Sequence, residues 1–174
     1  MEPARVSPVA LMLEVIEEHS PPTIWTGAPL AAFRQVANTN RGDIGEEFVR
    51  RYLAQRGIEV SKAGSRVSKS DMEVFGSRIE IKTASEDTGG NFQFNHVRLD
   101  RKYDYLLCLG VRPHEIVFNA WPKGEVSEGK AGTLVRMAEG QSVTFKLTKK
   151  PEAMRRVEDL PDWVRDLGDT PVMA

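Results

Sequence analysis

Two carboxylates and an amine, those of Asp71, Glu80 and Lys82, lie close together in the sequence. Glu80 and Lys82 are two residues apart, so on a β-strand both side chains point to the same face. Sites rich in oxygen ligands and poor in nitrogen or sulfur suit hard ions such as Mg²⁺. The pattern indicates either a cation site or an exposed strand face with mixed charges, and by itself it favours neither.

The segment 70–82 that carries these residues has the pattern of a β-hairpin. Two alternating runs flank Gly76 and Ser77, a pair typical of a two-residue turn. A slip of one residue would bury charges, so the register is strongly specified. This turn places Glu73 and Glu80 side by side, and a bound cation would offset the repulsion between their carboxylates. The pairs that the turn predicts are Val74 with Ile79, Met72 with Ile81, Asp71 with Lys82 and Glu73 with Glu80.

A helix predicted over residues 40–53, with Asn40 as its N-cap, supplies a third carboxylate. Glu46 lies at the edge of its apolar face, where it could reach a site beside the sheet. Glu47 points away and is placed to pair with Arg51. For Glu46 alone, a surface pair with Arg50 is the favoured alternative. The apolar face comprises Ile44, Phe48, Val49, Tyr52 and Leu53.

The remaining pattern predicts an α/β fold in which helices flank a central mixed β-sheet. Helices are expected over 9–16 and 31–36, and strands over 58–60, 103–111, 116–121 and 142–147, with a mobile loop over 83–90. Pro151 and Pro161 each stand where a C-terminal helix could begin. The chain reads as a single domain with a helical extension over 1–38, a core over 40–148 and a helical tail over 151–174.

Composition limits the classes of protein further. The chain has 174 residues, 40% of them hydrophobic and 28% charged, as in ordinary globular domains. Its single cysteine, Cys108, lies in an apolar run and is expected to be a buried core thiol, which excludes a thiolate zinc site and favours a reducing, cytoplasmic compartment. The N-terminus lacks a signal-peptide pattern, and no apolar run is long enough to span a membrane.

The net charge of −1 gives no global sign of nucleic-acid binding, but residues 34–69 are locally basic. Such an excess could follow a phosphate backbone, although a solvated helix face is the favoured reading. In the alternating run 92–95, Gln93 falls on the polar face just beyond the candidate site. His96 could be a base, a DNA contact or a surface residue, and the last is favoured. The candidates for contact with DNA are Arg41, Lys62, Arg66, Lys69, Asn95 and His96.

The order of these features along the chain resembles the PD-(D/E)xK nuclease superfamily. A helix with Glu46 comes first, followed by Asp71, by Glu80-Ile81-Lys82, and then by Gln93 and a buried strand. That superfamily includes many restriction endonucleases and junction resolvases. The resemblance covers residues 42–121, less than half of the chain. Ser70 stands where the motif has proline. The implied fold is a restriction-endonuclease-like core with additional N- and C-terminal helices.

The resemblance implies that Asp71, Glu80, Glu46 and the carbonyl of Ile81 hold Mg²⁺, with Mn²⁺ as an alternative. Lys82 would then orient or activate water, and Gln93 would hold a phosphate or a water. The implied function is a Mg²⁺-dependent endonuclease of restriction or defence type, acting on double-stranded DNA as a homodimer. The alternatives are a structure-specific nuclease for junctions or repair, a non-catalytic DNA-binding module, and an unrelated α/β protein without a carboxylate cluster.

Overall fold

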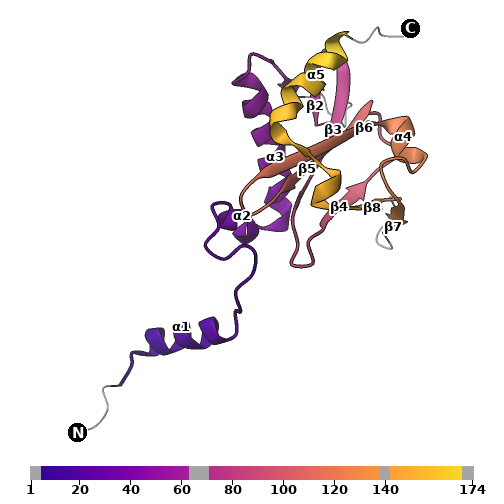
Figure 1. Ribbon diagram of the computed structural model, residues 1–174. Helices are drawn as coiled ribbons and strands as arrows, with labels where there is room; N and C mark the ends of the chain where they lie inside the picture. The colour runs from indigo at the N-terminus through magenta and orange to yellow at the C-terminus, as the bar shows by residue number, and fades with distance from the viewer. Residues whose placement is uncertain (1–4, 63–70, 138–141, 170–174) are drawn as a thin grey trace.

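The computed structural model describes residues 5–62, 71–137 and 142–169 (Figure 1). The helices are α1 (Pro8–Glu18), α2 (Ala31–Gln35), α3 (Asn38–Ala54), α4 (Lys123–Ser127) and α5 (Leu160–Asp169), with 3-10 turns η1 (Pro151–Ala153) and η2 (Val157–Asp159). The strands are β1 (Ser61–Lys62), β2 (Met72–Val74), β3 (Ser77–Ser85), β4 (Phe92–Val97), β5 (Tyr105–Val111), β6 (Ile116–Pro122), β7 (Leu134–Arg136), β8 (Phe145–Lys149) and β9 (Arg155–Arg156).

The strands form two sheets. The larger one has six strands in the order β1-β2-β3-β5-β6-β9. Strands β3 and β5 are parallel, whereas the other neighbours in this sheet are antiparallel. The smaller sheet has the order β4-β8-β7 and is antiparallel. This confirms the predicted α/β class with a mixed sheet flanked by helices, and the apolar run of β5 is a central strand as predicted.

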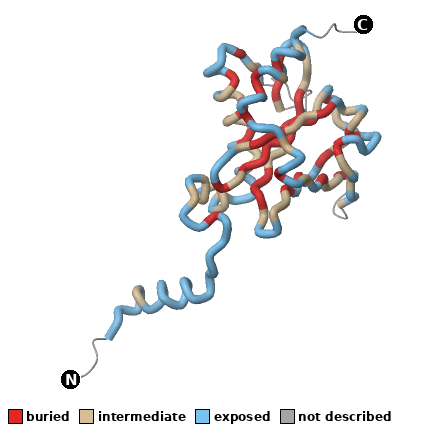
Figure 2. Tube along the Cα trace, in the orientation of Figure 1, coloured by how far each residue is buried: buried red, intermediate tan, exposed pale blue. Residues whose placement is uncertain are grey.

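Three layers enclose two apolar cores, one on each face of the larger sheet (Figure 2). On one face, Val49 and Leu53 of α3 and Leu160 of α5 pack against buried strand residues. On the other face, Phe92 and Phe94 of β4 pack with residues of β5, β6 and β8. Strand β3 contributes to both cores, because its successive side chains alternate between the two faces.

The β2–β3 hairpin forms, but the predicted register is wrong. The structure pairs Met72 with Ile79, Glu73 with Arg78 and Val74 with Ser77. The two turn residues are Phe75 and Gly76, both with positive φ (48° and 77°), as a type I′ turn requires. The turn is therefore one residue earlier than predicted and the register differs by two. The two glutamates do not face each other, so the repulsion inferred between them is absent.

A contact with the C-terminal helix explains why phenylalanine occupies this turn. The Phe75 ring lies against Gly168 of α5, where an added Cβ would come within 3.1 Å of the ring. A shift of two residues preserves the alternation of a strand, so the predicted faces survive. Accordingly, the four apolar residues of the hairpin, Met72, Val74, Ile79 and Ile81, are all buried.

Other differences concern the ends of elements. The predicted strand over 58–60 is wrong, since the first strand is β1. The predicted mobile loop begins too early, because parallel pairing with β5 extends β3 to Ser85. Helix α3 begins at Asn38 and its N-cap is Ala37, not Asn40. Its buried residues are Gly45, Val49 and Leu53, so the buried face is rotated away from Ile44, which is 41% exposed.

Helix α3 approaches β3 very closely at Gly45. A Cβ built on this residue would lie 1.9 Å from Oγ1 and 2.8 Å from Cβ of Thr83. Glycine is therefore required at this crossing, since any side chain would push the helix off the strand. The crossing matters because Glu46 is the next residue on the helix.

We expect Gly45→Ala to lower the free energy of unfolding by about 1–3 kcal/mol, the usual cost of forcing a group into a packed contact. Gly42→Ala, on the same helix, is the matched control, because its Cβ would meet nothing within 4 Å. It should be neutral or stabilising by about 0.5–1 kcal/mol, since alanine replaces glycine inside a helix. Urea denaturation of both variants checks this, and equal stabilities would contradict it.

The N-terminal region has two differently placed parts. Helix α1 stands apart from the rest of the chain in Figure 1, and none of its residues is buried. The segment around α2 packs on the core instead. Trp25 is buried and donates its Nε1 hydrogen to the carbonyl of Glu86 (2.9 Å), and Leu30 N donates to the carbonyl of Pro113 (3.1 Å). Within the described residues, no helix is both long and apolar enough to cross a membrane.

Candidate active site

The candidate site lies at an edge of β3 that has no strand beside it. Strand β2 pairs with β3 only as far as Ile79, and the described chain supplies no other strand there. Asp71 lies just before β2, and its Oδ2 accepts a hydrogen bond from the Ile81 N–H (2.7 Å). A strand residue directs its N–H and C=O to the same side, so the Ile81 carbonyl also faces this edge.

A cavity of about 680 Å³ opens along this edge, and we call it the β3-edge cavity. It collects side chains from α2, α3, β3, β4 and the loop before β5. All five residues predicted to be catalytic line it, together with Ile81: these are Glu46, Asp71, Glu80, Lys82 and Gln93.

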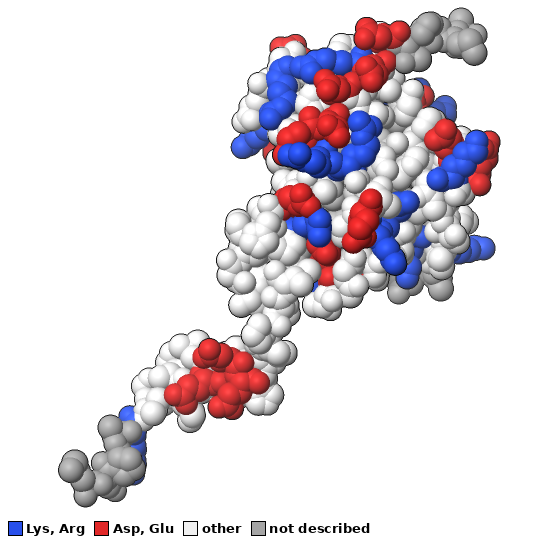
Figure 3. Space-filling model, viewed as in Figure 1, with Lys and Arg blue, Asp and Glu red and all other residues white. Residues whose placement is uncertain are grey.

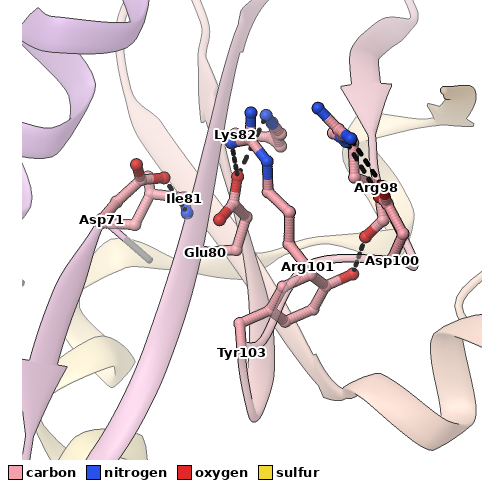
Figure 4. Close-up of polar contacts among 8 residues, drawn as sticks. All are labelled: Asp71, Glu80, Ile81, Lys82, Arg98, Asp100, Arg101 and Tyr103. Carbon is pink, nitrogen blue, oxygen red and sulfur yellow. Dashed lines mark hydrogen bonds and ion pairs between the residues drawn. The ribbon is translucent and has the colours of Figure 1, made fainter. Parts of the chain in front are cut away.

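Glu80 is the most deeply buried charged group of the site, with its side chain only 1% exposed. Figure 4 shows its carboxylate beside Lys82 and Arg101. Its Oε1 lies 3.3 Å from Lys82 Nζ and 3.7 Å from Arg101 Nη1. Its Oε2 is buried and has no hydrogen-bond partner among the residues that the structure describes. Burial, followed by the nearby charge of Asp71, raises the pKa of Glu80, and the charge of Lys82 opposes this. Such an orphaned carboxylate oxygen is costly unless another group binds it.

Glu46 extends from α3 to the same place and forms a hydrogen bond with Asp71. Partial burial, then the charge of Asp71 and this hydrogen bond, raise the pKa of Glu46 to about 7. Asp43 and Glu80 add smaller repulsions in the same direction. The three carboxylates of Glu46, Asp71 and Glu80, which we call the carboxylate cluster, therefore repel one another.

This repulsion predicts a pH dependence for the metal-free protein. The pKa of Glu46 is about 7 in the folded chain, against 4.5 for an unperturbed glutamate, so the folded state binds this proton more tightly. The resulting stabilisation is complete below about pH 4.5 and is lost as the pH rises through about 7. Glu46→Gln removes the charge, and we expect it to stabilise the protein by about 1 kcal/mol at high pH, a value reduced because the group is half-exposed.

Urea denaturation with EDTA at about pH 5 and about pH 8 measures this difference. Glu47→Gln is the control on the same helix, because Glu47 is exposed and its Oε1 accepts from Arg51 Nε (2.8 Å). That variant should show no gain at the higher pH. A Glu46→Gln protein less stable than the wild type at both pH values would contradict the assignment.

The predicted surface pair between Glu46 and Arg50 is wrong. Arg50 pairs with Glu47, which also pairs with Arg51 as predicted. Cys108 is fully buried, as expected, and burial raises the pKa of its thiol far above the usual range. It is therefore a core residue and no nucleophile.

Arg101 is a site residue that sequence reasoning missed. It lines the β3-edge cavity beside Glu80, and its Nε is buried without a partner (Figure 4). Its loop is held firmly. Tyr103 donates its hydroxyl hydrogen to the carbonyl of Arg98 (2.5 Å), and Arg98 forms a two-bond pair with Asp100 (2.9 and 2.6 Å). Lys123 donates to the carbonyl of Arg101 itself. The signal available in the sequence was the charged run 98–104 directly before the buried strand.

The predicted DNA contacts are only partly described. Arg41, Asn95 and His96 line the β3-edge cavity. Asn95 and His96 are exposed on β4, where the predicted alternation with the buried phenylalanines is confirmed. Arg66 and Lys69 lie outside the described residues, as does the side chain of Lys62.

The donor set of the carboxylate cluster suits a hard divalent ion. Its ligands would be three carboxylates and a backbone carbonyl, all oxygen. Among the described residues, Oε2 of Glu80 has no hydrogen-bond partner that would compete with an ion. In the described part of the chain, no three His, Cys, Asp or Glu residues are already arranged to hold a metal ion.

No family model matches the sequence, and no curated protein matches it. Among solved structures, the chain is similar to a bacterial homing endonuclease, with 14% sequence identity and a TM-score of 0.45 over 76% of this chain and 93% of that chain. Both values are too low for the likeness to support an argument, so the function of the chain has to be inferred from its own side chains.

Proposed function

We propose that the protein is a metal-dependent nuclease that hydrolyses DNA phosphodiester bonds. The observation that carries this proposal is the meeting of the carboxylate cluster with Lys82 at an open strand edge, 3.3 Å from Glu80. The motif of the PD-(D/E)xK superfamily supports it, because Glu46 is on helix α3 and Glu80 and Lys82 are on strand β3. Asp71, which the motif has on a strand, lies just before β2 instead.

Asp71, Glu80, Glu46 and the Ile81 carbonyl would hold Mg²⁺, or Mn²⁺ in its place. A bound metal of this kind polarises the phosphoryl group and lowers the pKa of bound water. It would also offset the repulsion that raises the pKa values of Glu46 and Glu80.

The protein's own cations then act on the substrate. Lys82 Nζ orients the attacking water and stabilises negative charge on the phosphate as the water oxygen bonds to phosphorus and the bond to the leaving oxygen breaks. Arg101, whose Nε lacks a partner, donates to a phosphate oxygen. Gln93, exposed on β4 at the cavity wall, holds a phosphate oxygen or a water.

The test is incubation with assorted DNAs, with and without Mg²⁺ or Mn²⁺. We expect cleavage that EDTA abolishes and that Glu80→Gln or Lys82→Ala lowers by at least about 100-fold, as for loss of a group that stabilises transition-state charge. Glu73→Gln is the matched control, an exposed glutamate on the same hairpin outside the β3-edge cavity. A cleavage rate that stays at the wild-type level in both the Glu80→Gln and the Lys82→Ala variants would refute the site assignment.

Within this class, we propose restriction or defence cleavage of double-stranded DNA. A structure-specific nuclease for junctions or repair intermediates is the alternative on the same site, and a comparison of intact plasmid with a synthetic four-way junction separates the two. A binding-only module on this fold would bind DNA without a divalent ion and cut neither substrate. The orphaned oxygen of Glu80 favours a site that binds a cation.

A chain of this size that cuts both strands would most simply act as a two-fold dimer, and we propose α1 as the contact. Among its residues, Val9, Leu13 and Ile16 are 71%, 60% and 51% exposed. An isolated helix of 11 residues is marginal in water, so it needs a partner for its apolar side. The glutamates of α1 form the acidic patch on this helix in Figure 3. By helical spacing Glu14 and Glu18 lie away from the apolar side and would remain in water, whereas Glu17 lies at its edge beside Leu13.

Light scattering after size exclusion tests this contact with the full-length chain. We expect a dimer for the wild type and a monomer for the double variant Leu13→Glu/Ile16→Glu, because two buried carboxylates would oppose the pairing. The control Glu14→Gln/Glu18→Gln changes the polar side of the same helix and should remain dimeric. A dimer that survives the first pair of substitutions would place the contact elsewhere.

A further inference from the structure

Two arginines line the β3-edge cavity without an acidic partner. Arg34 of α2 donates from Nη1 to Ser85 Oγ (3.0 Å). Arg41 of α3 donates from Nε to the carbonyl of Val36 (3.1 Å) and from Nη2 to that of Arg34 (3.0 Å). Among the described residues, no carboxylate lies within ion-pair distance of either side chain. The third arginine that lines the cavity, Arg101, differs in this respect, since it contacts Glu80.

The arginine pair is held in place although its charges repel. Partial burial and the nearby charge of Arg34 lower the pKa of Arg41. Aromatic faces support both guanidinium groups, because Arg34 lies 5.8 Å from the centroid of Trp25 and Arg41 lies 5.7 Å from that of Phe33. Two fixed, half-buried guanidinium groups without a carboxylate are suited to a bound anion, and their planar forks match phosphate oxygens.

The start of α3 adds to the positive potential beside these arginines. Its N-cap, Ala37, makes no side-chain capping bond, and its first turn contains no acidic residue. The free N–H groups of a helix start attract negative charge. Asn38 and Thr39 of this turn also line the cavity.

The position of the pair along β3 relates it to the carboxylate cluster. Arg34 contacts Ser85, three residues beyond Lys82 on the same strand, or about 10 Å along it. A DNA strand rises by about 3.4 Å per nucleotide, so it covers this distance in a few nucleotides.

We propose that Arg34 and Arg41 form a second anion site in the β3-edge cavity, which holds a backbone phosphate of the DNA strand a few nucleotides from the phosphate that is cut. The identification of the anion as a DNA phosphate rests on the proposed function, whereas the anion site itself rests on the unpaired arginines. The site makes α2 part of the substrate-binding surface and explains why the segment around it is fastened to the end of β3.

Binding of a fluorescent DNA duplex in EDTA, measured by anisotropy over a range of NaCl concentrations, tests the proposal without cleavage. Each of Arg34→Gln and Arg41→Gln should weaken binding and reduce the slope of log K against log salt by about one, the value for one lost phosphate contact. Arg51→Gln is the matched control, because Arg51 is on the outer side of α3 with its side chain 77% exposed. It should leave the slope unchanged.

Two further variants separate binding from folding, because both arginines also bond within the protein. Ser85→Ala removes the hydrogen-bond partner of Arg34 without changing charge, and it should retain the wild-type slope. Arg34→Lys/Arg41→Lys keeps both charges and should retain most of the slope as well. The double variant Arg34→Gln/Arg41→Gln removes both charges. If the salt slope falls as much in the lysine variant as in this glutamine double variant, the loss comes from rearrangement and the proposal is overturned.

An unchanged slope in the glutamine double variant would overturn the proposal, as would a wild-type protein that does not bind DNA at low salt. The outcomes for the proposed function are distinct. A reduced slope in the glutamine variants, together with a wild type that does not cleave DNA with Mg²⁺, would support the anion site and reject the nuclease. Mg²⁺-dependent cleavage by the wild type, together with an unchanged slope in these variants, would support the nuclease and reject the anion site.

Discussion

An unpaired strand edge is the feature on which the rest of this site depends. Strand β2 ends beside Ile79, so beyond that point the polar groups of β3 have, within the described residues, no strand to bond with on one side. The carboxylate of Asp71 takes the place of the missing strand at Ile81. The close crossing of α3 at Gly45 then brings Glu46 to the same edge. Backbone that would otherwise bond to a neighbouring strand is thereby available to a ligand.

The electrostatics of the cavity follow from this arrangement. Acidic groups gather where β3 is open, and basic groups flank them: Lys82 on β3, Arg101 in the loop before β5, Arg34 on α2 and Arg41 on α3. The ion pairs within the cavity do not neutralise all of these acidic and basic side chains. Within the described residues, one oxygen of Glu80 has no hydrogen-bond partner, and Arg34 and Arg41 form hydrogen bonds but no ion pair with a carboxylate. A cavity with both deficits has room for a cation and a polyanion together.

Much of the site was predictable because strand and helix periodicity fix which side chains share a face. The two-residue spacing put Glu80 and Lys82 together, and the helical angle selected Glu46 over Glu47. The predicted hairpin register was wrong by two residues, yet the predicted buried and polar faces of the hairpin were correct, because a shift by an even number of residues preserves the alternation of side chains. What failed was the turn, since the contact of Phe75 with Gly168 joins residues far apart in the chain.

The sequence by itself determined the elements, the buried faces and the residue types of the carboxylate cluster, because these follow from local periodicity and side-chain chemistry. Only the tertiary structure decided that the cluster lies at an open edge, that Arg101 stands beside Glu80, and that α2 closes the cavity with Arg34. These contacts join residues separated by 21 positions (Arg101–Glu80) and 51 positions (Arg34–Ser85). No local pattern encodes such distances, because they arise from the packing of strands and helices around the two cores.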